Sequence, residues 1–138
     1  MVRYRVIDHT ADLGLQIFGQ TVAELFVNGV YALFDLMTDL EQVQSTAERI
    51  VTATGTDWPE LWVNYLRECL YVFNGEGLLI RECVILSLDQ SQVTARLRGE
   101  PFDPVRHQIK REIKAVTYHQ ATVQSTAQGW KGEVILDV

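Results

Sequence analysis

Apolar and polar residues alternate at the start of the chain, and the spacing then becomes helical. Residues 3–7 alternate, and Leu13, Leu15 and Ile17 alternate again after a polar interruption at residues 8–12. A period of two places successive side chains on opposite faces of a strand. We therefore expect two strands joined by a turn at residues 8–12.

Two longer segments have the spacing of amphipathic helices, each preceded by a capping signal. Thr21 with Glu24 forms a capping box, in which each residue satisfies a free main-chain amide of the first turn. Asp57 with Glu60 repeats that arrangement, with Pro59 in the first turn, where its missing N–H costs little. The apolar stripes that follow are Val22, Leu25, Phe26, Val30, Leu33, Phe34 and Met37, and then Trp58, Leu61, Trp62, Tyr65, Leu66, Cys69, Val72 and Phe73.

The rest of the chain has the composition of a sheet. Strands are expected at residues 49–54, 78–88, 91–98, 113–124 and 133–138, with a loop at residues 99–104. Two helices with about seven strands predict an α+β fold, in which the helices pack on mostly antiparallel sheet. The order of the strands stays open.

Composition narrows the class of protein. The 138 residues are the length of one domain, residues 1–138. No apolar run approaches the roughly 20 residues of a membrane span, and no signal peptide is visible, so we expect a cytoplasmic protein without a membrane partner. The 12 basic and 18 acidic residues give a net charge of −6, which disfavours a broad nucleic-acid-binding face. Cys69 and Cys83 are more typical of small buried hydrophobes than of a redox or metal pair.

Acidic residues gather at two places that the strand pattern leaves polar. Asp8, His9 and Asp12 lie in the first turn, where they are candidate ligands of a hard cation or ordinary turn formers. Asp137 and Val138 close the last strand. If that strand lies beside the first turn, several carboxylates converge, and such a cluster calls for a cation or a raised pKa.

Residues 106–114 contain four basic side chains, at Arg106, Lys110, Arg111 and Lys114. They form either a patch for a phosphate, an RNA or an acidic partner, or a solvated strand edge. His107 and His119 have no partner at catalytic spacing, which favours structural hydrogen bonding over general-base chemistry. Motifs for a hydrolase nucleophile, a nucleotide loop or a zinc finger are absent.

Five motifs, in order along the whole chain, resemble the archease family. They are DHTADLG at 8–14, WVNYLRECL at 62–70 with GLL at 77–79, GEPFD at 99–103 with RH at 106–107, IKAVTYH at 113–119 and LDV at 136–138. The resemblance implies an α/β sandwich similar to a redox-regulated chaperone domain. It also implies a metal-binding accessory protein of RtcB-type RNA ligases, which join RNA ends in tRNA splicing and RNA repair.

On that resemblance the chain is not itself an enzyme. It would promote guanylylation and multiple turnover of the ligase, and would meet RNA only through the ligase. An alternative is a chaperone-like binding module for an RNA-processing or RNA-modifying enzyme, which would show a large exposed apolar patch. A free-standing metal-dependent hydrolase would need a general base in a pocket.

The family's metal site, carried over by position, falls on Asp12, Asp137 and Val138. Oxygen ligands suit Ca²⁺, the cation we expect in a crystal, and also Mg²⁺ or Mn²⁺. The remaining candidates would lie beside the metal ligands or face the partner. They are Asp8, His9, Lys114, His119, Arg106 and His107.

Overall fold

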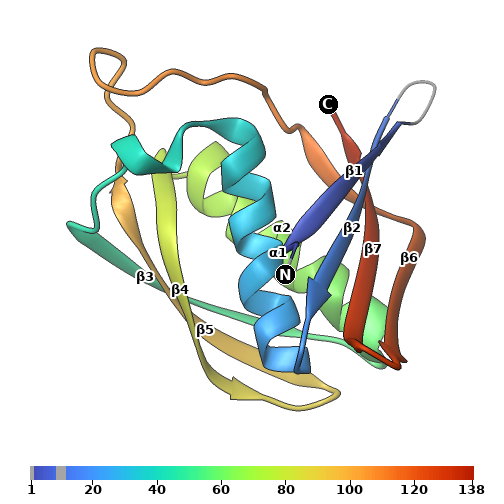
Figure 1. Cartoon of the computed structure of the whole chain (residues 1–138). Helices are drawn as coiled ribbons and strands as arrows, with labels where there is room; N and C mark the ends of the chain where they lie inside the picture. Colours follow the sequence, from blue (N-terminus) through green and yellow to red (C-terminus); the bar gives the residue numbers. More distant parts are fainter. Residues whose placement is uncertain (1, 9–11) are drawn as a thin grey trace.

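The computed structural model describes residues 2–8 and 12–138 and is shown in Figure 1. Within this described part, the predicted two helices and seven strands are confirmed. The strands are β1 (Tyr4–Asp8), β2 (Leu13–Gly19), β3 (Ala47–Thr54), β4 (Leu78–Leu88), β5 (Gln92–Pro101), β6 (Ala115–Thr126) and β7 (Gly129–Asp137). The helices are α1 (Val22–Met37) and α2 (Trp58–Asn74), with a short 3-10 turn at Leu40–Gln42.

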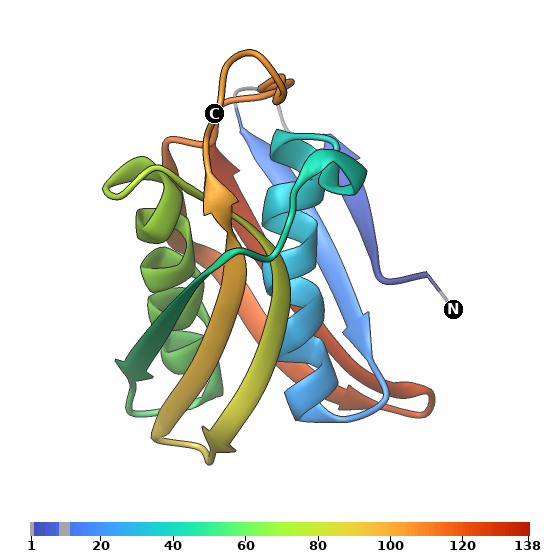
Figure 2. The same cartoon turned by 90° about the vertical axis from the view of Figure 1, so that its left-hand side faces the viewer.

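The strands form two antiparallel sheets, and the helices lie between them. One sheet has four strands in the order β1-β2-β7-β6, and the other has three in the order β3-β5-β4. Figures 1 and 2 show α1 and α2 side by side in the middle layer. The predicted fold class, α+β with helices packed on antiparallel sheet, is confirmed.

Both helices begin at the predicted caps. The Thr21 hydroxyl accepts a hydrogen bond from the Glu24 N–H at 3.1 Å. The Asp57 carboxylate accepts one from the Glu60 N–H at 2.9 Å, and Glu60 in turn accepts one from the Thr56 N–H at 3.0 Å. Each helix is therefore started by local contacts that the sequence itself specifies.

Trp62 connects the helical layer to the four-stranded sheet. Its indole is completely buried and lies 5.2 Å from the Phe26 ring, centre to centre. A Cβ added at Gly29 of α1 would lie 2.8 Å from this indole, and one added at Gly132 of β7 would lie 2.9 Å from it. The two glycines therefore leave the space that the tryptophan fills.

The segment at residues 99–101 corrects the sequence prediction. It was expected to be loop, but it continues β5, and Gly99 pairs with both Ala47 and Ile80. A Cβ at Gly99 would lie 1.7 Å from the Leu79 carbonyl oxygen, so the close approach of β4 requires glycine here. The glycine that suggests a turn is instead needed inside the sheet.

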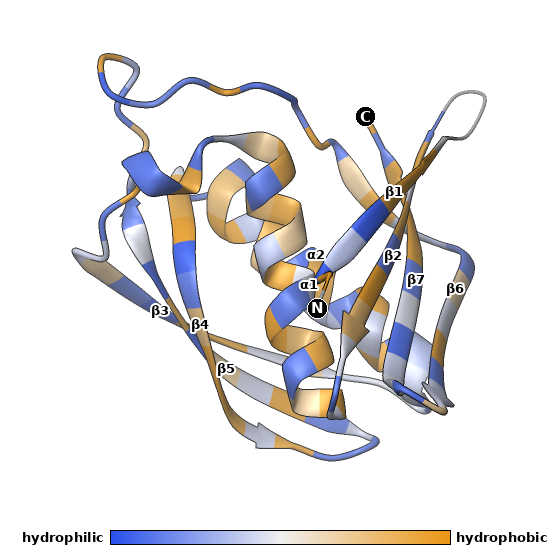
Figure 3. Ribbon diagram, viewed as in Figure 1, coloured by the Kyte–Doolittle hydropathy of each residue, from blue (hydrophilic) through white to orange (hydrophobic). Residues whose placement is uncertain are grey.

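Residues 102–114, called here the connection, join the two sheets across the ends of the helices (Figure 1). The connection is mainly hydrophilic (Figure 3) but is fixed to the end of α1. The Thr38 hydroxyl donates to the Gln108 carbonyl at 2.8 Å, and the Lys110 N–H donates to the Met37 carbonyl at 2.8 Å. These bonds hold the connection against α1.

The two cysteines are free thiols near the Tyr65 hydroxyl. Cys69 is buried, Cys83 is half-buried, and the Cys83 sulfur lies 3.3 Å from the Tyr65 oxygen. Burial raises the pKa of both thiols, which keeps them in the less reactive protonated form. In the described part of the chain, no helix is long and apolar enough to span a membrane.

Gly29→Ala tests the packing of Trp62. Alanine raises helix propensity by about 1 kcal/mol, but its methyl group would meet the buried indole, and overpacking typically costs about 1–3 kcal/mol. We expect a net loss of about 1 kcal/mol in the free energy of unfolding, measured by urea denaturation.

The same substitution in a Trp62→Phe background provides the control. Phenylalanine lacks the two indole atoms that approach Gly29 most closely, Cη2 and Cζ3. In that background Gly29→Ala should be neutral or stabilising. An equal loss in both backgrounds would show that the indole is not the cause.

Candidate functional site

The four strands of the four-stranded sheet each have one terminus at the same end of the sheet, close to the C-terminus of the chain (Figure 1). Leu13, the first residue of β2, pairs with Asp8 on one side and with Leu136 on the other. Asp137 pairs with Ala115, and its carbonyl accepts a hydrogen bond from the Lys114 N–H at 2.7 Å. The strand end therefore gathers three of the five motifs that the sequence singled out.

The register also brings the chain segments that carry the two candidate carboxylates to the same end of the sheet. Leu13 and Leu136 are buried and face the helices, so Asp137, the next residue of β7, belongs to the opposite face, whereas Asp12 lies in a bend just before β2. Asp12 and Asp137 are the residues next to the last described pair of β2 and β7, Leu13 with Leu136. Asp12 is half-buried and Asp137 is exposed.

The donor set at this edge fits a hard divalent cation. Asp12 and Asp137 offer carboxylate oxygens, and Val138 adds main-chain oxygens beside them. Such oxygen ligands suit Ca²⁺, Mg²⁺ or Mn²⁺ better than Zn²⁺. In the part of the chain that the structure describes, no three His, Cys, Asp or Glu side chains form a metal-holding group. The two aspartates therefore need main-chain or water oxygens to complete a coordination shell.

The other candidates at this edge differ in what the structure shows of them. His9 and the side chain of Asp8 lie outside the described part of the chain. Lys114 is exposed and directly precedes β6. His119 is also exposed, in a stretch of β6 where pairing with β7 is interrupted and where Gln120 adopts a φ of 54°. His119 therefore sits on an irregular segment rather than beside the two aspartates in the strand register.

Helix α2 holds the start of β6 in place through two side chains that the sequence reasoning did not single out. The Arg67 Nε donates to the Val116 carbonyl at 2.9 Å, and the Asn74 amide donates to the Ile113 carbonyl at 2.9 Å. The Arg67 guanidinium also lies 4.1 Å from the centre of the Tyr118 ring. Arg67 falls inside the WVNYLRECL motif, which was the available signal.

The hollow beside these contacts opens next to Lys114. It has a volume of about 260 Å³ and is lined by Arg67, Leu70, Tyr71, Asn74, Lys114, Ala115 and Val116. Tyr71 is 60% exposed. The two cations and the exposed phenol ring lie on the α2 side of the candidate metal ligands.

His107 is a structural residue of the connection, which corrects the expectation that it faces a partner. Its side chain is fully buried, and its Nδ1 accepts a hydrogen bond from the Asp103 N–H at 2.9 Å. Nε2 must then carry the proton, and it donates to the Glu100 carboxylate at 2.8 Å. Both ring nitrogens therefore form hydrogen bonds within the protein, as expected for a structural histidine.

Glu100 is the centre of this network. Burial by itself raises the pKa of its carboxyl group, but hydrogen bonds from the Gln44 N–H, Arg106 and His107 outweigh that effect and lower the pKa from 4.5 to about 2. Arg106 is partly exposed and also lies 3.7 Å from Asp103. Arg106 is therefore neutralised by carboxylates, whereas Lys110, Arg111 and Lys114 make no ion pair within the described residues.

Comparison with known proteins gives a consistent result. The sequence profile of the archease protein family matches residues 4–138. The chain is 34% identical to the protein archease of Methanosarcina mazei, covering 99% of this chain and 96% of that protein. It is 36% identical to the protein archease of Methanopyrus kandleri, covering 96% of each.

Solved structures agree with the sequence comparison. The solution structure of protein 1598 from Methanobacterium thermoautotrophicum superimposes with a TM-score of 0.82, at 30% identity over 99% of each chain. A crystal structure from Thermotoga maritima, described as an archease and possible chaperone, gives a TM-score of 0.63. Its 19% identity, over 96% of this chain and 94% of that one, shows a shared fold.

Glu100→Gln tests the buried carboxylate through its pH dependence. Because folding lowers the pKa from 4.5 to about 2, the charged group stabilises the fold above pH 4.5 and loses that effect as the pH falls toward 2. The variant should have a lower urea midpoint than wild type at pH 7, measured by circular dichroism, and the difference should shrink between pH 4.5 and pH 2.

Glu48→Gln is the matched control. Glu48 is 53% exposed and lies 3.8 Å from Arg96, a surface pair of little expected effect. Its urea midpoint should follow that of wild type at every pH. A constant difference for Glu100→Gln across the pH range would contradict the assignment.

Proposed function

Because this chain belongs to the archease family, we propose that it is an accessory protein that holds a divalent cation and activates an RtcB-type RNA ligase. On this proposal residues 1–138 act as one cytoplasmic domain, and activation involves RNA only through the ligase. The observation that supports it is the pairing of Leu13 with Leu136, which brings the next residues, Asp12 and Asp137, to the same end of the sheet.

The residues at this end of the sheet would have different roles in binding the cation. Asp12, Asp137 and the main-chain oxygens of Val138 would hold the cation, with Ca²⁺, Mg²⁺ and Mn²⁺ as candidates. A bound cation would supply positive charge to a phosphate group in the ligase's active site. The Lys114 N–H fixes the Asp137 main chain, and its ammonium group would offset carboxylate repulsion when no cation is bound.

The surroundings favour contact with a partner rather than catalysis by this chain alone. The site lies at an exposed strand end, where Asp137 and Lys114 face solvent. Lys110 and Arg111 are exposed on the connection that leads to Lys114, and no carboxylate pairs with them in the described part of the chain. These cations would meet acidic groups or phosphates of a docked ligase.

A chaperone-like binding module is the second candidate. It is favoured by the exposed apolar side chains of Ile50, Val84 and Leu86 on the three-stranded sheet, which are 54%, 45% and 48% exposed. However, Ile50 and Val84 lie on either side of Arg96 in one cross-strand row. A charged side chain therefore interrupts this row of exposed apolar residues, which argues against a large continuous apolar patch here.

Asp12→Asn and Asp137→Asn test the proposal. Each change removes one negative ligand while preserving shape. We expect Ca²⁺ or Mn²⁺ affinity, measured by calorimetry, to fall more than about tenfold, the lower end of the loss seen for altered metal surroundings. We also expect each variant to lose the ability to accelerate an RtcB-type ligase under multiple turnover with GTP and manganese.

Asp39→Asn provides the matched control, because Asp39 is exposed and asparagine caps a helix equally well. It should accelerate the ligase as wild type does. If wild type and both site variants accelerate turnover equally, activation does not use the carboxylates. If none accelerates it, the activator assignment is wrong and the binding module is favoured.

A further inference from the structure

The four-stranded sheet carries a second hollow at its other end. The hollow has a volume of about 410 Å³, within the range of small-molecule sites. It is lined by Val2, Arg5, Phe18, Gly19, Thr126, Gln128, Trp130 and Lys131. Along β2, Leu13 at the carboxylate end and Gly19 at the hollow are six residues apart, or about 20 Å. The two sites are therefore separate.

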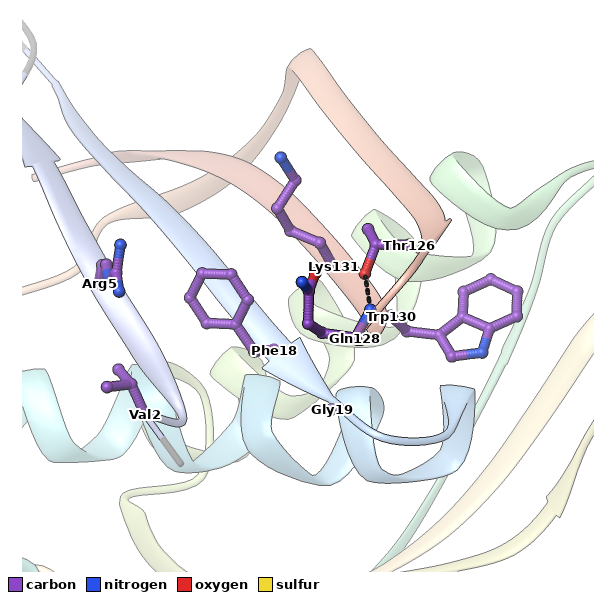
Figure 4. Close-up of a pocket in the computed structure, with 8 residues that line it drawn as sticks. All are labelled: Val2, Arg5, Phe18, Gly19, Thr126, Gln128, Trp130 and Lys131. Atoms are coloured by element: carbon purple, nitrogen blue, oxygen red, sulfur yellow. Dashed lines mark hydrogen bonds between the residues drawn. The ribbon is translucent and has the colours of Figure 1, made fainter.

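The hollow lies on the face of the sheet that the helices do not cover. The Tyr4 hydroxyl donates to Asp35 of α1, so the next residue, Arg5, belongs to the outer face. Phe18 pairs with Lys131 across β2 and β7 on that same outer face. Figure 4 shows the Phe18 ring between Arg5 on one side and Gln128 and Lys131 on the other.

The two cationic side chains that line the hollow, Arg5 and Lys131, make few contacts within the described residues. Arg3, two residues before Arg5, is held elsewhere: it donates to Asn28 at 2.8 Å and lies over the Tyr31 ring at 3.7 Å. Arg5, by contrast, has no hydrogen bond or ion pair within the described residues, and its guanidinium lies 5.7 Å from the centre of the Phe18 ring. Lys131 lies 3.6 Å from Glu133 in a partly exposed pair, which contributes little.

The remaining polar group at the hollow is the Gln128 side-chain amide. Gln128 is exposed, and its side-chain amide makes no hydrogen bond within the part of the chain described here. A free amide offers both donors and an acceptor. The hollow thus combines an aromatic ring, two cations and an amide, on a chain whose net charge is −6.

We propose that this hollow binds a nucleotide unit, either free or within single-stranded RNA. The base would pack against the Phe18 ring, Arg5 and Lys131 would bond the phosphate, and Gln128 would contact the edge of the base. Aromatic stacking combined with basic side chains is the usual way in which proteins hold unpaired nucleotides. An aliphatic anion would leave the ring unused, and an uncharged aromatic would leave both cations unused.

Titration of the whole chain with four probes tests the proposal. The probes are GMP, guanosine, inorganic phosphate and a hexanucleotide single-stranded RNA, with dissociation constants measured by calorimetry. GMP should bind more tightly than guanosine or phosphate, because only GMP engages both the ring and the cations. Tighter binding of the RNA than of GMP assigns the unit to a strand, and equal binding assigns it to a free nucleotide.

Four variants separate the contributions. Arg5→Gln, Lys131→Gln and Phe18→Leu should each weaken GMP binding by about fivefold or more, and Phe18→Tyr should retain it. Arg49→Gln, a change to an exposed arginine of β3 paired with Glu76 at 3.5 Å, is the control and should bind as wild type does. Unfolding curves check that each variant is folded.

The proposal is overturned if GMP does not bind at millimolar concentration. It is also overturned if phosphate binds as tightly as GMP, or if Arg5→Gln and Phe18→Leu leave GMP binding unchanged. Asp137→Asn should leave GMP binding unchanged, because the carboxylate end is about 20 Å away. Failure at the hollow is thus distinguishable from failure of the metal-dependent activation.

Discussion

The antiparallel pairing of β2 with β7 is the interaction on which the rest of the structure depends. It runs from Leu13 opposite Leu136 to Gly19 opposite Trp130. At one end of this pairing the next residues are Asp12 and Asp137, and at the other end Phe18 lies beside Lys131. A slip of one residue would move every side chain of one strand to the opposite face. Such a slip would change the position of one carboxylate relative to the other and would expose apolar side chains that pack against the helices. The same register therefore determines both the stability of the fold and the geometry of the candidate site.

Helix α2 stabilises that register through contacts on the face of the sheet that packs against the helices. Trp62 fills the space left by Gly29 and Gly132, which fixes β7 against both helices. Further along the helix, Arg67 and Asn74 donate to main-chain carbonyls at and just before the start of β6. The helix therefore holds both β7, which carries Asp137, and the adjacent strand β6. A substitution in α2 can disturb the strand end without touching a carboxylate, which is why folding must be measured alongside any loss of activation.

Local features of the fold could be predicted from the sequence, whereas contacts between distant segments could not. The caps at Thr21 and Asp57 involve residues three apart, so the pattern contains the whole interaction. Gly99 was misassigned because its reason for being glycine is the Leu79 carbonyl, which lies on another strand. The burial of His107 depends on Glu100 and on Gln42, which a list of single residues does not connect. The strand order, and with it the hollow of Arg5, Phe18 and Lys131, required the tertiary structure.

The distribution of charge sets how an acidic protein can act next to RNA. A net charge of −6 repels a nucleic-acid backbone at long range, so broad contact with RNA is disfavoured. Short-range contact is not, because charges beyond about 8 Å are screened at physiological salt. Exposed cations without an ion pair among the described residues include Lys110, Arg111 and Lys114 on the connection and Arg5 at the hollow. The protein is therefore suited to meeting single phosphates that a partner presents, rather than to binding a strand along its length.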